Sequence, residues 1–248
     1  MSVKDEIRVF LRNNEPDKLV ELASREKSTI RQLTSFLYSE DELLRWRAAE
    51  GFGAIAGNPH IFSAEKLRTI ISRLTLNLED RSGGNAWGSM EAVGAIIAAR
   101  SYQLENEIPK LFSFIHDARL WKGLLWSARK IGEQNPSLLQ NRLHQVIGLL
   151  RNPSNTTRGH AAWVLGVIGD GDSIEILESL QKDKHGIRIY DKGGLRNITV
   201  GGLAKQSIDE IKAGPRHFKP RSLGKKPLRL SGQPRAVKRT TVSRRRPS

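Results

Sequence analysis

Four of the five tryptophans and two glutamates recur at matched places along the chain, and these residue types could bind a partner or carry acid–base chemistry. An indole ring can anchor a peptide or stack on a nucleobase. A carboxylate beside such a ring can act as a general base or hold a cation. The candidate binding residues are Trp46, Glu50, Trp87, Glu91, Trp126, Arg158 and Trp163.

The tryptophans are predicted to share one face of a repeated helix. Trp46 and Trp87 hold one aligned position, and Trp126 and Trp163 hold another that lies four residues later. Residues four apart lie on the same helix face, so the four rings should form one stripe. The stripe predicts either a groove that grips a partner or rings that fill the space between repeats.

The two glutamates also allow two interpretations. Glu50 and Glu91 hold the aligned position that Trp126 and Trp163 take in the later repeats. On a surface rich in aromatic rings, this acid could bind a cation or accept a proton. The more economical explanation is a solvated or locally paired acid, for instance Glu50 with Arg47.

These residues belong to a pattern that recurs four times. Aligned on Glu50, Glu91, Trp126 and Trp163, the copies are 41, 35 and 37 residues apart. A period of this size predicts an all-α solenoid, in which helix pairs stack and bury their apolar faces on one another. The expected pairs are 28–38 with 39–56, 63–78 with 84–99, 103–116 with 119–133, and 137–150 with 156–169.

Small and branched residues within the pattern predict how the helices pack. Gly53, Gly94 and Gly166 should let neighbouring helices approach closely. The branched residues at one aligned position should form a ladder in the core: Ile55, Ile96, Ile131 and Ile168.

The segments outside the repeats have their own predicted roles. Residues 1–26 read as capping helices, 27–169 as the repeats, and 170–213 as a C-terminal cap. The cap should consist of a helix, a β-hairpin of 187–190 and 195–200 around the turn 191–194, and a final helix over 200–212. Residues 214–248 are predicted to be a disordered basic tail.

The basicity of the chain is concentrated in that tail. The formal net charge is +15, and residues 214–248 hold 12 of the 41 Lys and Arg but no Asp or Glu. Such a segment cannot bury enough apolar area to fold alone. It could bind polyanions by releasing their counterions, or it could be solvated without a dedicated partner. The candidate contacts are Lys225, Lys226, Lys238, Arg239, Arg244, Arg245 and Arg246.

Composition argues against several classes of function. The chain has no cysteine, which excludes disulfides, thiol nucleophiles and cysteine-ligated metals. The six histidines show no metal-binding spacing, and no nucleophile motif occurs, so we expect no metal, no cofactor and no enzyme. The longest apolar run is too short to cross a membrane, and the charged start resembles no signal peptide. We therefore expect a cytoplasmic protein without a membrane role.

The repeated runs resemble a known group of repeats. Residues 45–56 and 157–168 are similar to the HEAT-like repeats named after phycobilisome lyases, with their Arg-x-x-Ala-Ala core. Residues 83–94 look like a run found in uncharacterised bacterial HEAT-repeat proteins. The resemblance covers roughly residues 28–213 and implies an armadillo-like fold used by scaffolds, adaptors and chromophore lyase subunits. HEAT-like glycosylases for alkylated DNA bases share the architecture more distantly, and no residue role carries over from them.

The leading hypothesis is a non-enzymatic scaffold that binds a macromolecular partner, a protein above all, through its concave helix face, while the tail attracts an acidic protein or nucleic acid. The first alternative is a DNA- or RNA-binding protein, with alkylbase glycosylase activity as its enzymatic form. The second alternative is a role like that of a chromophore lyase subunit. The oligomeric state and the identity of the partner do not follow from the sequence.

Overall fold

Helices make up most of the chain, and a single hairpin interrupts them near the end of the described part. The computed structural model describes residues 1–79, 88–169 and 171–214. The α-helices are α1 (Val3–Asn13), α2 (Pro16–Arg25), α3 (Thr29–Phe36), α4 (Glu42–Ala56), α5 (Ala64–Glu79), α6 (Ser89–Ala99), α7 (Ile108–Phe112), α8 (Trp121–Gln134), α9 (Leu143–Leu149), α10 (Asn155–Ile168), α11 (Asp172–Leu180) and α12 (Val200–Lys212). Short 3-10 helices span Glu105–Glu107, Ser113–His116, Ala118–Leu120 and Pro136–Arg142.

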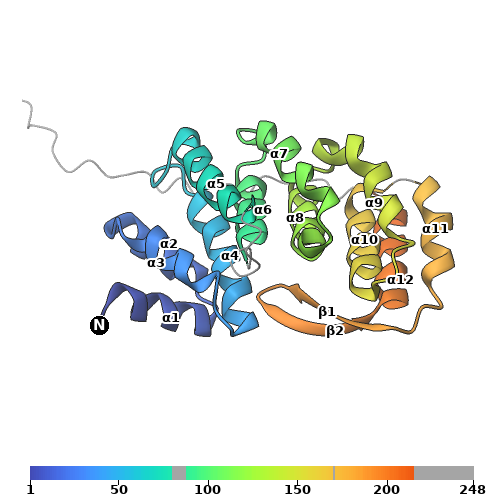
Figure 1. Cartoon of the computed structure of the whole chain (residues 1–248), viewed down its shortest axis with the longest axis horizontal. Coiled ribbons are helices and arrows are strands. Elements are labelled where there is room, and N and C mark those ends of the chain that lie inside the picture. Colours follow the sequence, from blue (N-terminus) through green and yellow to red (C-terminus); the bar gives the residue numbers. More distant parts are fainter. Residues whose placement is uncertain (80–87, 170, 215–248) are drawn as a thin grey trace, which may run out of the picture. The chain divides into compact units, whose positions relative to one another are not determined.

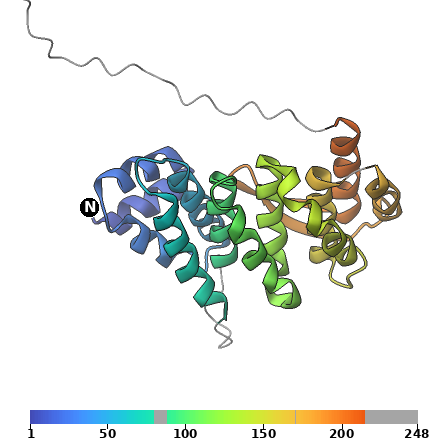
Figure 2. The same ribbon diagram turned by 90° about the horizontal axis from the view of Figure 1, so that it is seen from above.

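The four helices that carry the repeated pattern are α4, α6, α8 and α10, here called the pattern helices. They pack in chain order, α4 on α6, α6 on α8 and α8 on α10, and α12 then packs on α10 (Figures 1 and 2). Gly53 approaches α6 so closely that a Cβ there would lie 3.0 Å from the backbone oxygen of Ala95. Gly94 likewise faces Ser127 of α8 with no room for a side chain. As predicted, small residues permit the close approach, and the aligned isoleucines are fully buried: Ile55, Ile96, Ile131 and Ile168.

Capping side chains decide where α4 starts. The Asp41 carboxylate accepts hydrogen bonds from the backbone N–H groups of Leu43 (2.9 Å) and Leu44 (3.2 Å). These groups have no partner inside the helix, so an acid at this position stabilises the start. The helix expected from residue 39 therefore begins three residues later, because Asp41 and not Ser39 is its cap.

Two helices that the periodicity predicts as continuous are broken. The expected helix 103–116 becomes the 3-10 turn Glu105–Glu107, the short α7 and the 3-10 turn Ser113–His116. Pro109 lies in the first turn of α7, where its missing N–H costs nothing, and it prevents a longer helix that starts earlier. The expected helix 137–150 likewise starts as the 3-10 helix Pro136–Arg142 before α9.

The predicted hairpin is present. Strands β1 (Gly186–Asp191) and β2 (Gly194–Thr199) pair antiparallel, with Asp191 opposite Gly194. Lys192 and Gly193 form the two-residue turn at φ values of 50° and 79°, the left-handed geometry that matches the twist of the strands. The final helix, α12, spans Val200–Lys212 as the sequence predicts.

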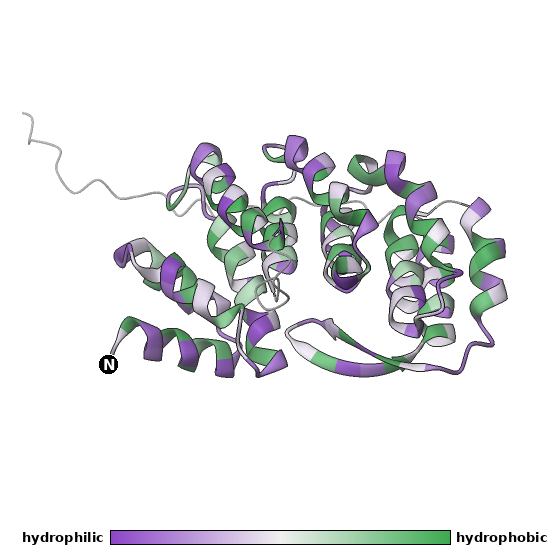
Figure 3. Cartoon of the chain, viewed as in Figure 1, coloured by the Kyte–Doolittle hydropathy of each residue, from purple (hydrophilic) through white to green (hydrophobic). Residues whose placement is uncertain are grey.

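Hydropathy follows the packing. Figure 3 shows polar and apolar residues alternating along α1, whose buried residues are Ile7 and Leu11. By contrast, α6 is apolar over most of its length, because neighbours cover it on several sides. Within the described ranges, none of the helices is long and apolar enough to span a bilayer.

Candidate functional site

The hairpin lies across the pattern helices and is held through its main chain (Figure 1). One side chain from each of three helices donates a hydrogen bond to a hairpin carbonyl oxygen: Arg47 of α4 to Gly193 (2.9 Å), Trp126 of α8 to Tyr190 (3.0 Å) and Asn155 of α10 to Gly186 (3.0 Å). Together these three contacts fix the hairpin along its length. We call the side of α4, α8 and α10 that it covers the hairpin-covered face.

The tryptophans of this face are buried beneath the hairpin. Trp46, Trp126 and Trp163 are 4%, 0% and 2% exposed, and they share a hydrophobic cluster with hairpin side chains. Trp46 stacks on Tyr190 with ring centroids 5.2 Å apart and touches Trp126 at the same distance. Trp87 lies outside the described residues. The three described rings thus fill space between helices and hairpin, and their role in binding a partner stays a prediction.

Glu50 is paired across the molecule. Its carboxylate accepts a hydrogen bond from the Tyr190 hydroxyl (2.6 Å) and forms an ion pair with Lys130 of α8 (3.1 Å). Burial, and then the neighbouring Glu50 carboxylate, raises the pKa of Tyr190 well above its ordinary value. The local partner considered from the sequence, Arg47, donates instead to the hairpin and to the carbonyl oxygens that end α1.

Glu91 occupies the equivalent place on α6 but has different surroundings. Its half-buried carboxyl group lies against Gly123 of α8, where an added Cβ would come within 2.9 Å. Burial raises the pKa of Glu91, and the charges of Lys122 and Arg45 oppose this only in part. No ion pair to Glu91 forms within the part of the chain that the structure describes. A buried acid with a raised pKa is typical of functional sites.

Lys122 and Lys130 each place an ammonium group on a tryptophan face. Lys122 lies 5.3 Å from the centroid of Trp46 and pairs with Glu42 (2.9 Å), and Arg188 of the hairpin reaches the same carboxylate (3.3 Å). In the same way, Lys130 lies 5.4 Å from Trp126 and pairs with Glu50. The carboxylates and rings therefore already hold cations from this chain.

These lysines were not among the predicted site residues. A signal was available in the sequence, because Glu42 and Glu50 on α4 and Lys122 and Lys130 on α8 are each eight residues apart. Residues at this spacing lie near one stripe of a helix, so two helices carrying matched acids and bases can pair twice.

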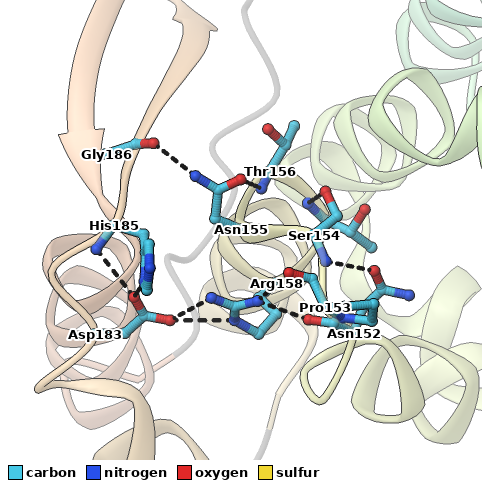
Figure 4. A network of polar contacts seen from close by, with 10 residues as sticks. Asn152, Pro153, Ser154, Asn155, Thr156, Arg158, Asp183, His185 and Gly186 are labelled. Carbon is cyan, nitrogen blue, oxygen red and sulfur yellow. Dashed lines mark hydrogen bonds and ion pairs between the residues drawn. The ribbon is translucent and has the colours of Figure 1, made fainter.

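Arg158 belongs to a polar network at the base of the hairpin (Figure 4). Its guanidinium group donates to the carbonyl oxygens of Asn152 (2.7 Å) and Pro153 (2.8 Å) and pairs with Asp183 (2.8 Å). Burial acts to raise the pKa of Asp183, but hydrogen bonds from Arg158 and His185 outweigh it and lower the pKa to about 2. Arg158 thus joins the turn before α10 to the segment before β1.

Another cation near the face, Arg129, is similarly engaged. It pairs with Glu210 of α12 (2.7 Å) and Glu133 (2.8 Å), donates to the carbonyl oxygen of Trp163 (2.8 Å), and lies over that indole ring. Arg129 of α8 thus joins α12, through Glu210, and α10, through the carbonyl oxygen of Trp163. Removing one partner of such a buried pair would leave an uncompensated charge and destabilise the protein.

His160 is a buried, neutral histidine beside Trp163. Burial lowers its pKa from 6.5 to about 4, because the charged form loses its hydration. Its Nδ1 lies 2.8 Å from the carbonyl oxygen of Thr156, which makes Nδ1 the protonated nitrogen. Nε2 has no hydrogen-bond partner within the described residues.

Two further predictions concern metals and the tail. Over residues 1–79, 88–169 and 171–214, no cluster of three or more His, Asp or Glu could hold a metal ion. The predicted polyanion contacts lie outside the described residues: Lys225, Lys226, Lys238, Arg239, Arg244, Arg245 and Arg246.

Comparison with known proteins adds little to this geometry. No family model and no curated protein match the chain. Among solved structures, an engineered protein from the Northeast Structural Genomics Consortium is similar over 87% of this chain and 98% of its own, with 18% identity and a TM-score of 0.43. A likeness this distant supports no conclusion about function.

Proposed function

We propose that this chain is a non-enzymatic HEAT-like scaffold that binds an acidic macromolecule, with the basic tail supplying the main electrostatic attraction. The observation that carries the proposal is the separation of charge. Residues 214–248 hold 12 bases and no acid, whereas the remaining residues hold 29 bases and 26 acids. A segment of this kind attracts polyanions over a distance and without sequence readout.

The packing of the pattern helices supports the scaffold part of the proposal. Each contacts the next in chain order through small residues, as stacked helical repeats do. The chain length between copies and the Arg-x-x-Ala-Ala runs fit HEAT-like units. A helical stack of this kind offers an extended surface to partners. Most cations of its hairpin-covered face are already paired within the protein.

The burial of the tryptophans affects where a partner would bind. A ligand cannot stack on Trp46 or Trp126 while Tyr190 and the hairpin cover them. A partner that approaches this face therefore meets the outer side of the hairpin first. This favours an electrostatic contact over an aromatic groove.

The test compares the full chain with a chain that ends at Ala213, using fluorescence anisotropy with a DNA duplex and with polyglutamate. We expect the full chain to bind at least one polymer, with affinity that falls steeply as salt rises, and the shortened chain to bind at least tenfold more weakly. Binding by neither form, or binding that salt does not change, contradicts the proposal.

Glu91 gives the glycosylase alternative one specific support. It is a half-buried acid with a raised pKa and without an ion pair in the described residues. Such an acid can transfer a proton. Release of alkylated bases by the wild-type protein, abolished in Glu91→Gln, would establish the enzyme, and no release by the wild-type protein would exclude it.

A further inference from the structure

The hairpin segment exposes charges of one sign. Between residues 182 and 199 the exposed ionisable side chains are all basic: Lys182, Lys184, His185, Arg188 and Lys192. On the described helices acids and bases mix at the surface, as on α1, where Lys4 and Asp5 are both exposed. The segment therefore differs from the helical surface in the sign of its field.

The two acids of this segment face inward and are neutralised. Asp183 is 12% exposed and pairs with Arg158, and Asp191 is 21% exposed and pairs with Arg196 (3.4 Å). Arg188 contacts Glu42, yet 57% of its side chain remains exposed. Lys184 and Lys192 form no ion pair within the described residues, so their charges are open to a partner.

We infer that the exposed bases Lys184, Arg188 and Lys192, the hairpin strip, form the folded contact for a nucleic-acid phosphate backbone. The inference rests on the proposed function, because the tail would bring the polyanion to the strip. Lys184 and Lys192 are eight residues apart, so the strip is at most roughly 27 Å long at about 3.4 Å per residue. One nucleic-acid strand places about eight phosphates over that length.

A nucleic acid fits this strip better than an acidic protein does. Protein interfaces centre on apolar or aromatic anchors, whereas nucleic-acid interfaces are polar and strongly positive. The apolar side chains of β1, namely Ile187, Ile189 and Tyr190, are all buried against the helices. The outer side of the strand therefore offers charge and no anchor.

The hairpin is also held in place before any partner arrives. Arg47, Trp126 and Asn155 fix its carbonyl oxygens from below. A preorganised strand loses little entropy on binding, which favours a contact made by only a few charges.

The experiment uses the full chain and the double variant Lys184→Gln/Lys192→Gln. The matched control is Lys4→Gln/Lys66→Gln, two exposed lysines on α1 and α5 that form no ion pair within the described residues. Both variants lose the same net charge. Binding to a short fluorescent DNA duplex is measured by anisotropy over a series of salt concentrations.

We expect the hairpin variant to bind on the order of tenfold more weakly and its salt slope to fall by about two, one for each lost phosphate contact. The control should keep the wild-type slope. Equal slopes in the two variants overturn the inference while leaving tail binding intact. Wild-type binding to polyglutamate but not to DNA also overturns it and assigns the site to an acidic protein. Failure of the wild-type protein to bind either polymer refutes the proposed function itself.

Discussion

Glu50 and Glu91 hold the same aligned position on successive pattern helices, yet they have opposite surroundings. Glu50 receives the Tyr190 hydroxyl from the hairpin and Lys130 from α8. Glu91 lies against the bare backbone of Gly123, and burial raises its pKa. Trp126 takes the same position on α8 and packs under the hairpin. The repeat thus specifies where the side chain at this position lies. Contact with the hairpin distinguishes the surroundings of Glu50 and Trp126 from those of Glu91.

Substituting the aligned residues one at a time should separate these roles, and Trp126→Ala should have the largest effect. It removes a fully buried ring, its contacts with Trp46 and Tyr190, and the hydrogen bond to the hairpin. We expect a loss of about 4 kcal/mol in the free energy of unfolding, measured by denaturant titration. Trp121→Ala, at a half-buried ring outside the aligned position, should cost less. Equal losses would contradict a special role for the aligned position.

Acid should destabilise the protein through His160, at the Trp163 end of the face. Its pKa is lowered from 6.5 to about 4, so between these values the unfolded state binds more protons and stability falls as pH falls. The full effect is about 3 kcal/mol, of which about 2 kcal/mol should appear between pH 7 and pH 5. Glu91 acts in the opposite direction, because a raised pKa favours the folded state at low pH.

Denaturant titrations of the wild-type protein and His160→Gln at several pH values test the contribution of His160 to the pH dependence of stability. The variant should show a flatter dependence over the same range. A wild-type stability that stays constant from pH 7 to pH 5 would contradict a buried, neutral His160.

Glycine substitutions should sharpen the contrast around Glu91. Gly123→Ala places a methyl group 2.9 Å from the end of the flexible Glu91 side chain, which has to move aside, so the gain that alanine gives a helix should be offset and the free energy of unfolding should change by less than about 0.5 kcal/mol. The matched control is Gly148→Ala in α9, where no atom lies within 4 Å of the added Cβ. That change should stabilise the helix by about 0.5–1 kcal/mol. An equal gain in both variants would show that the contact with Glu91 has no cost.

The helices and the hairpin could be predicted from the sequence because their signals are local. The bounds of α12 and the two-residue turn at Lys192 and Gly193 follow from periodicity and from the glycines after Asp191. The breaks around α7 were missed, although Pro109 marks them.

The docking of the hairpin could not be predicted. Tyr190 and Glu50 are 140 residues apart, and three further contacts run from helix side chains to main-chain oxygens of the hairpin. Such contacts leave no pattern in residue types. Without them, the tryptophan stripe is consistent with an open groove and with rings that fill space between repeats, the second being the commoner case.

Substituting the two glutamates tests the opening contrast directly. Glu50→Gln keeps the shape of the side chain but removes the charge that Lys130 and Tyr190 bind. Hydrogen bonds to a charged group are stronger than neutral ones, so we expect a loss of about 1–2 kcal/mol. Glu91→Gln removes a charge that burial already disfavours, and the stability should change by less than about 0.5 kcal/mol.

The pair of variants separates the environment from the residue type, since the substitution and the aligned position are the same. A comparable loss at both positions would mean that Glu91 has a stabilising partner after all. A loss at Glu50 that disappears when Tyr190→Phe and Lys130→Gln are already present would show that these two partners, one of them on the hairpin, create the difference.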